Sequence, residues 1–171
     1  MRIVIIISAI LLYSCGGSDP SKTFSGNEFS GSGYSVHVPD DWQTKRNFMG
    51  SDMIASRPSV ANEQFTENIN VILENLPEKM SAQEYYNQSK ENLEKMSGSP
   101  VTSEELVELN GSNALKIRYQ LTMGQMVMDN NVYLVVNDAS AYVITLSMRK
   151  GESRDKWLPE LTRVAQTFQV E

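Results

Sequence analysis

Apolar and polar side chains alternate with a period of two over much of the chain, a pattern typical of strands with one buried face. The alternation is clear over residues 34–38 and again over residues 68–77. Trp42 follows the first of these strands and is predicted to lie in the core or at its rim. Between the two strands, residues 51–56 are predicted to form a short strand and residues 58–67 a loop.

A helix is predicted over residues 81–96, because this segment has both a start and a stop signal. Ser81 and Glu84 form a capping box, in which each side chain can bind the other residue's free backbone N–H. Gly98, with a proline shortly after it, is typical of a helix end. The face expected to lie on a sheet consists of Ala82, Tyr85, Leu93 and Met96.

Four further strands are predicted to form an antiparallel meander, over residues 104–109, 114–123, 126–136 and 141–149. The Asn110-Gly111 pair is a strong hairpin signal, since both residues tolerate positive φ. On the second strand of the meander, the residues predicted to face inward are Leu115, Ile117, Tyr119, Leu121 and Met123. Those predicted to face outward are Lys116, Arg118 and Gln120.

A second helix is predicted near the end of the chain, within residues 153–168. The apolar residues with helical spacing are Trp157, Leu158, Leu161, Ala165 and Phe168. Pro159 is predicted to lie in or near the first turn, where its missing N–H would break no helical hydrogen bond.

The N-terminal region differs, with an uninterrupted apolar run over residues 3–13. The run is shorter than the roughly 20 residues that span a bilayer, so it predicts a signal peptide rather than a membrane span. It ends in Leu-Tyr-Ser-Cys, which resembles the lipoprotein box of bacteria and implies lipid attachment at Cys15, with cleavage just before it. We therefore expect a lipoprotein signal peptide over residues 1–14, a lipidated Gly/Ser-rich tether over 15–33 and one folded domain over 34–171.

The charge and the cysteine content limit which partners the chain can bind and how its core can be stabilised. The chain has 15 Lys and Arg against 21 Asp and Glu, a formal net charge of −6, which argues against nucleic acid or anionic lipid as a partner of the folded part. Cys15 is the only cysteine of the sequence, so no intramolecular disulfide can form and packing must stabilise the core. Contact with the membrane is expected to run through the lipid anchor.

The order of elements resembles the PsbP-like family. Residues 34–42, Tyr-Ser-Val-His-Val-Pro-Asp-Asp-Trp, are similar to its opening strand, turn and tryptophan, and residues 68–96 are similar to its middle strand and helix. The final meander and closing helix match as well. The resemblance implies an α+β fold, an α/β/α sandwich with a twisted antiparallel sheet and helices packed on its faces. The family includes an extrinsic photosystem II subunit, a nuclear import factor and bacterial lipoproteins of the DcrB type, which share binding rather than chemistry.

The resemblance therefore implies a membrane-anchored binding or assembly module of the bacterial cell envelope, which is no enzyme and needs no cofactor. Its partner would be another envelope protein or a small ligand. A hydrolase is the weakest alternative, because a nucleophilic serine normally needs a histidine base. His37 is the only histidine, and it lies in the middle of a predicted strand, where a structural role is the simpler interpretation.

A Cu(I)-binding metallochaperone is the other alternative. Met123, Met126 and Met128 lie close together and offer three thioethers, which are soft ligands suited to Cu(I). Methionine is also an ordinary core residue, and the chain has 9 of them. No second histidine or further cysteine supports a site, so the sequence favours packing and no metal site is predicted.

Overall fold

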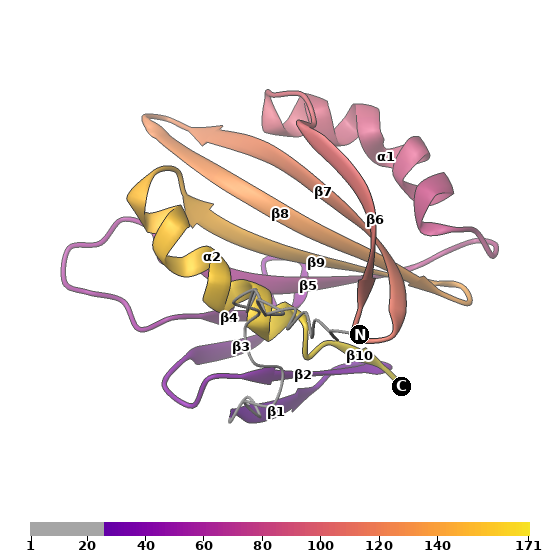
Figure 1. The fold of residues 1–171 in the computed structure, drawn as a ribbon, viewed down its shortest axis with the longest axis horizontal. Helices are drawn as coiled ribbons and strands as arrows, with labels where there is room; N and C mark the ends of the chain where they lie inside the picture. Colours follow the sequence, from indigo (N-terminus) through magenta and orange to yellow (C-terminus); the bar gives the residue numbers. More distant parts are fainter. Residues whose placement is uncertain (1–25) are drawn as a thin grey trace, which may run out of the picture.

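A seven-stranded antiparallel sheet forms the centre of the fold. The computed structural model describes residues 26–171 (Figure 1). The strands of this sheet are β3 (Gln43–Phe48), β4 (Ser51–Ser56), β5 (Asn68–Asn75), β6 (Ser103–Leu109), β7 (Ser112–Met123), β8 (Met126–Asn137) and β9 (Ser140–Arg149). Their order across the sheet is β3-β4-β5-β9-β8-β7-β6, so the predicted four-strand meander is confirmed.

Helix α1 (Ala82–Ser97) covers one face of the sheet, over β7 and β8 (Figure 1). Its predicted capping box is confirmed, since the Glu84 N–H donates to Ser81 Oγ at 3.2 Å and the Ser81 N–H donates to Glu84 Oε2 at 2.8 Å. Gly98 ends the helix with a φ of 69°. The core beneath it is made by Tyr86, Leu115, Ile117, Val132, Leu134 and Ala141.

The other face, which we call the α2 face, is covered by helix α2 (Glu152–Ala165) and a small second sheet. The strands of that sheet are β1 (Asn27–Ser30), β2 (Tyr34–Val38) and β10 (Gln169–Val170), in the order β1-β2-β10. Aromatic rings join these covers to the large sheet, since the Tyr34 ring centroid lies 5.2 Å from that of Phe168 and 5.8 Å from that of Tyr142. Trp42 is buried, as predicted. Helices on both faces of a twisted antiparallel sheet confirm the expected α+β sandwich (Figure 1).

Two methionines that were expected to face inward are exposed. Met96 is 77% exposed, because the last turn of α1 packs through Ser97, and Tyr86 provides the large buried side chain of the helix instead. Met123 is 58% exposed, because it is the last residue of β7, at the tip of the hairpin to β8. The expected faces are therefore wrong at the ends of these two elements.

The expected position of Pro159 in the first turn of α2 is also wrong. The helix begins earlier than expected, at Glu152, so Pro159 lies inside it. Its missing N–H leaves the Asp155 carbonyl without a helical partner. Neither described helix is long and apolar enough to cross a membrane.

Strands β1 and β3 have no counterpart among the predicted elements. Residues 27–30, which the sequence places in the tether, pair with β2 and bury Phe29. Strand β3 is exposed along its whole length, so it carries no apolar period that could have revealed it.

Candidate functional site

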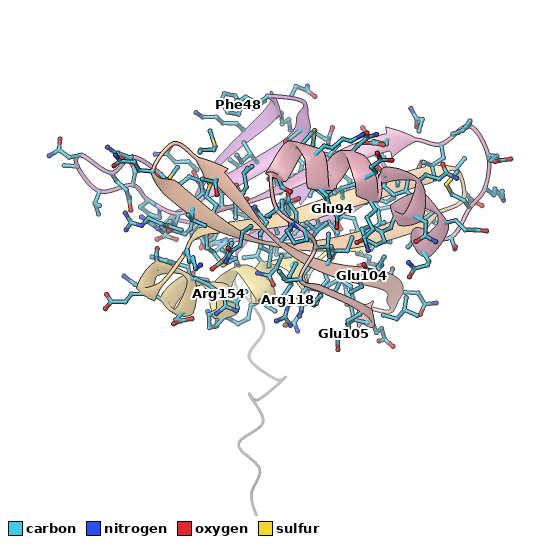
Figure 2. All side chains as sticks on the ribbon, turned by 90° about the horizontal axis from the view of Figure 1, so that it is seen from above. Phe48, Glu94, Glu104, Glu105, Arg118 and Arg154 are labelled. Carbon is cyan, nitrogen blue, oxygen red and sulfur yellow. The ribbon has the colours of Figure 1, made fainter. Side chains whose placement is uncertain are left out.

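A polar groove of about 410 Å³ lies between strands β7 and β8 and the beginning of α2. It opens on the α2 face of the large sheet. The side chains that argue for a site come from Arg118, Gln120, Asp129, Asn131, Lys150, Arg154 and Asp155. Figure 2 shows Arg118 and Arg154 close together on the side of α2.

Strand geometry explains why polar side chains gather here. Ile117 points into the core beneath α1, so its neighbour Arg118 and the alternate residue Gln120 point to the α2 face. The β7–β8 ladder places Arg118 opposite Asn131. It likewise places Gln120 opposite Asp129. Such cross-strand pairs share one face and lie within reach of each other, so the floor of the groove consists of two neighbouring polar pairs.

Asn131 is a buried amide without a hydrogen-bond partner. It is only 3% exposed, and its side chain forms no hydrogen bond within residues 26–171. Its neighbour Asn130 is also buried but alternates to the α1 side, where its Oδ1 accepts a hydrogen bond from Ser147 at 2.8 Å and its Nδ2 has no partner. Among the described residues, Asn130 Nδ2 is the only side-chain nitrogen or oxygen that is both fully buried and without a partner, so the amide atoms of Asn131 still reach the solvent of the groove.

Cations outnumber carboxylates in the groove, although the chain as a whole carries a net charge of −6. Arg118 and Lys150 form no ion pair within the described residues. Arg154 is engaged, because its Nη1 donates to Asp155 Oδ1 at 2.9 Å and its Nε lies 3.8 Å from Asp129 Oδ2. The free positive charge of the groove is therefore carried by Arg118 and Lys150.

The first turn of α2 closes one side of the groove. Gly151 is the N-cap residue, with a φ of 96° that glycine adopts without strain. Because glycine has no side chain, the first turn has no side-chain capping hydrogen bond. The backbone N–H groups of this turn keep hydrogen-bonding capacity, and the helix dipole adds partial positive charge. Glu152 and Asp155, in the same turn, offset part of that charge.

A buried ion-pair network holds the start of α2 in place. Arg57, directly after β4, binds the carboxylates of Glu63 and Glu67, and its Nε lies 2.7 Å from Glu67 Oε2. Ser153 of α2 donates a hydrogen bond to the other Glu67 oxygen, and the Arg57 guanidinium lies over the Trp157 ring, 5.0 Å from its centroid. Burial alone would raise the pKa of Glu67, but hydrogen bonds from Ser153 and Arg57 outweigh burial and hold the pKa below its ordinary value. The network thus holds the first turn of α2, which forms one wall of the groove, in its position.

His37 lies on β2 and does not line the groove. Its Nε2 is 3.9 Å from Glu28 Oε2 on the neighbouring strand β1. Within residues 26–171 the imidazole forms no hydrogen bond to a hydroxyl or thiol, although the His37 backbone N–H donates to Thr167 Oγ1 at 2.8 Å. The described structure therefore gives His37 no nucleophile to activate.

The methionine segment forms the tip of the β7–β8 hairpin. Met123 is the register partner of Met126, and Met128 is the next residue on the same face of β8. Met128 is 5% exposed, so it belongs to the packed interior, whereas Met123 is mostly exposed. Among residues 26–171, no group of three or more His, Cys, Asp or Glu side chains could hold a metal ion. Cys15, the predicted lipid site, lies outside the described residues.

One signal in the sequence could have pointed to the groove. Residues 129–131, Asp-Asn-Asn, interrupt a long central strand that is otherwise apolar toward its C-terminal end. Consecutive polar residues fit neither a strand buried on both faces nor one with a single buried face. Such an interruption marks either a water-filled site or a ligand site.

Solved structures match this chain, whereas no family model and no curated protein sequence does. Cyanobacterial PsbP (CyanoP) from Synechocystis sp. PCC 6803 is 18% identical with a TM-score of 0.61, over 91% of this chain and 98% of CyanoP. LpqN of Mycobacterium tuberculosis, which is involved in cell envelope biogenesis, is 14% identical with a TM-score of 0.60, over 89% of this chain and 86% of LpqN. A Bacteroides thetaiotaomicron protein is 18% identical with a TM-score of 0.60, over 85% of this chain. The chain spans about half of that protein's length, 48%.

The chain has the PsbP-like fold. Nearly the whole of CyanoP is covered, so the likeness extends over the complete domain rather than one motif. The resemblance found in the sequence is thereby confirmed at the level of the fold. What this PsbP-like domain binds must be argued from its own groove, because identities of this size carry no site residues.

Proposed function

We propose that this PsbP-like chain is a non-catalytic binding module of the bacterial cell envelope. A lipid on Cys15 holds it at a membrane, and the groove beside α2 is its binding site. Its partner is another envelope protein or a small ligand.

The observation that carries this proposal is the amide of Asn131. It is 3% exposed and has no partner within the described residues, and it lies in the floor of the groove beside Arg118, which forms no ion pair there. The amide forms no hydrogen bond with the described residues, so no contact within the described protein explains an asparagine here. A ligand in the groove would explain it, because the ligand would bind amide atoms that otherwise meet only solvent.

Two further observations support an envelope role. The Leu-Tyr-Ser-Cys sequence that ends at Cys15 resembles a lipoprotein box. LpqN, whose fold is similar, is a protein of cell envelope biogenesis.

Site-specific photo-cross-linking tests the proposal. A photoreactive amino acid replaces Thr102, an exposed residue that lines the groove, in the full chain and in intact cells. A matched variant carries it at Lys79, an exposed lysine paired with Asp138 just beyond the other end of β8. We expect one discrete adduct from position 102, seen as a band of higher mass on a gel or as a small mass increase of the protein, and none of that mass from position 79. Identical products from both positions, or none from position 102, would contradict a binding site in the groove.

Cu(I) binding is a second candidate, because the β7–β8 register places Met123 opposite Met126. Two thioethers can therefore approach each other at the hairpin tip, with Met128 beside them on the same face. The burial of Met128 favours packing instead.

A further inference from the structure

The unused hydrogen-bond donors of the groove lie on adjoining parts of the fold. Arg118 and Asn131 face each other across the β7–β8 ladder. Lys150 and Gly151 stand where the chain leaves β9 and enters α2. A guanidinium and an amide both present N–H groups in a plane, which suits a planar oxyanion with two acceptor oxygens.

We propose that the groove binds its ligand through a carboxylate group, with Arg118 and Asn131 as the principal donors. The inference rests on the proposed function, because it names the ligand chemistry of the same groove. The carboxylate belongs to a small free acid or to the C-terminus of a peptide.

Asn131 distinguishes this site from an ordinary basic patch. An exposed arginine alone is common on protein surfaces and needs no ligand. Here the arginine adjoins a buried amide, 3% exposed, whose donors have no partner in residues 26–171. The amide lies on the α2 face and lines the groove, so a ligand that enters the groove reaches it. The uncapped first turn of α2 adds further N–H donors on the same side.

Charge balance favours a carboxylate over a phosphate. The groove is lined by three cations and two carboxylates, which leave one net positive charge. The cations are Arg118, Lys150 and Arg154, and the carboxylates are Asp129 and Asp155. A carboxylate carries one negative charge and neutralises this excess. A phosphate monoester carries about −1.5 to −2 at pH 7, and its second charge would meet the two aspartates at short range.

The groove also offers acceptors beside the donors. Asp129 Oδ1 accepts a hydrogen bond from Gln120 Nε2 at 2.9 Å, and a carboxylate has capacity for more than one such bond. Asn131 contributes its own amide oxygen. A ligand with an N–H near its carboxylate, such as the last residue of a peptide, would use both kinds of group. The volume of about 410 Å³ is within the usual range for small-ligand sites.

Titration of the full chain with four probes tests the inference. The probes are acetate, trialanine with a free C-terminus, amidated trialanine and inorganic phosphate. Isothermal titration calorimetry measures their binding, in nonionic detergent at low salt. We expect saturable binding of a free carboxylate and at least about tenfold weaker binding of the amidated peptide, which lacks the charge. Tight binding of trialanine with weak binding of acetate indicates a peptide C-terminus as the source. Comparable binding of both indicates a small free acid.

Three variants distinguish specific binding in the groove from non-specific electrostatic attraction to the protein surface. Arg118→Gln and Asn131→Leu should each weaken carboxylate binding about tenfold or more, since each removes a donor to a charged group. Lys79→Gln removes the same unit of charge at the other end of β8 and should leave the affinity unchanged. Arg118 is exposed, so its replacement tests the site without a risk to the fold.

The inference is overturned if free and amidated peptides bind alike, if phosphate binds in preference to every carboxylate, or if no probe binds. It is also overturned if Arg118→Gln and Lys79→Gln weaken binding equally. An adduct at position 102 without carboxylate binding would reject only the ligand class and leave the proposed binding module unaffected. Failure of both experiments would reject both proposals.

Discussion

Arg57 and Glu67 form an ion pair inside the protein, with side chains only 6% and 1% exposed. The pair closes the loop between β4 and β5, and through Ser153 it also reaches the first turn of α2. Two segments far apart in the sequence are thus held together next to the groove. Both charges are removed from water, so each depends on the other for its stabilisation.

Replacing Arg57 by methionine should lower the free energy of unfolding by about 3–5 kcal/mol. The change keeps most of the side-chain volume but leaves the buried Glu67 carboxylate without its cation. Urea denaturation of the full chain, followed by circular dichroism, measures the loss. Lys79→Gln removes the cation of an exposed ion pair with Asp138 and should cause no measurable change. Equal midpoints for the Arg57 and Lys79 variants would show that the buried network contributes nothing.

Stability should also fall in acid, because this network lowers two carboxyl pKa values. Hydrogen bonding to Arg57 lowers the pKa of Glu63. Glu67 also has a lowered pKa despite its burial, because of its bonds to Ser153 and Arg57. A group whose folded-state pKa is lowered stabilises the protein fully above its unfolded pKa, near 4.5, and this stabilisation is lost as the pH falls through the folded-state value.

The measurement is the free energy of unfolding from about pH 7 down to about pH 3, in the wild type and in Glu67→Gln. The variant should be less stable near neutral pH and should lose less stability in acid, because it has one titrating group fewer. Parallel acid limbs in the two proteins would contradict a role of Glu67 in the pH dependence.

Much of the fold could be predicted because its signals are local. The capping box of Ser81 and Glu84 sets the start of α1, and Asn110-Gly111 sets the first hairpin of the meander. Strand β3 could not be predicted, because both of its faces are exposed and its pairing with β4 is a tertiary event. Pro159 was misplaced because the start of α2 depends on distant partners, namely the contact of Ser153 with Glu67, rather than on a local cap.

The candidate site was predictable only in part. Strand alternation puts Arg118 on the outward face, which the structure confirms. This face forms a groove only because of the position at which α2 begins. The sequence has no local signal for that position. The polar residues 129–131 within β8 were a signal, but the sequence alone does not tell that all three line a groove.

Asn131→Leu should not lower the free energy of unfolding. The substitution removes an amide that forms no hydrogen bond with the described residues, and it keeps a similar side-chain volume. Urea denaturation in the absence of ligand measures the difference, and Arg118→Gln, at an exposed residue without an ion pair, should leave the midpoint unchanged. A loss of stability in the leucine variant would mean that the amide is satisfied in the free protein, and the main support for the groove as a binding site would be gone.

Cys15→Ser should leave the protein without a lipid, because serine offers no thiolate for the alkylation by diacylglycerol that the lipoprotein box implies. Cells that express the variant should release the protein from the membrane fraction and should not label it with a palmitate analogue. Ser18→Ala, just outside the lipoprotein box, is the matched control and should be labelled like the wild type. A Cys15→Ser protein that still carries the label and stays with the membranes would show that the predicted anchor is wrong.

Replacing Met126 and Met128 together by leucine should cost less than about 1.5 kcal/mol per site if these residues only pack, because the exchange conserves volume. The same change removes two thioethers, and leucine cannot ligate a metal. Anaerobic competition against a chromogenic Cu(I) chelator, with denaturation as a check on the fold, therefore separates the two interpretations. We expect neither protein to compete, since Met128 lies in the core and Met123 stands exposed at the hairpin tip. If the parent instead held one copper ion and the folded variant lost it, the register pair of Met123 and Met126 would be a metal site, and the metallochaperone would replace the binding module as the proposed function.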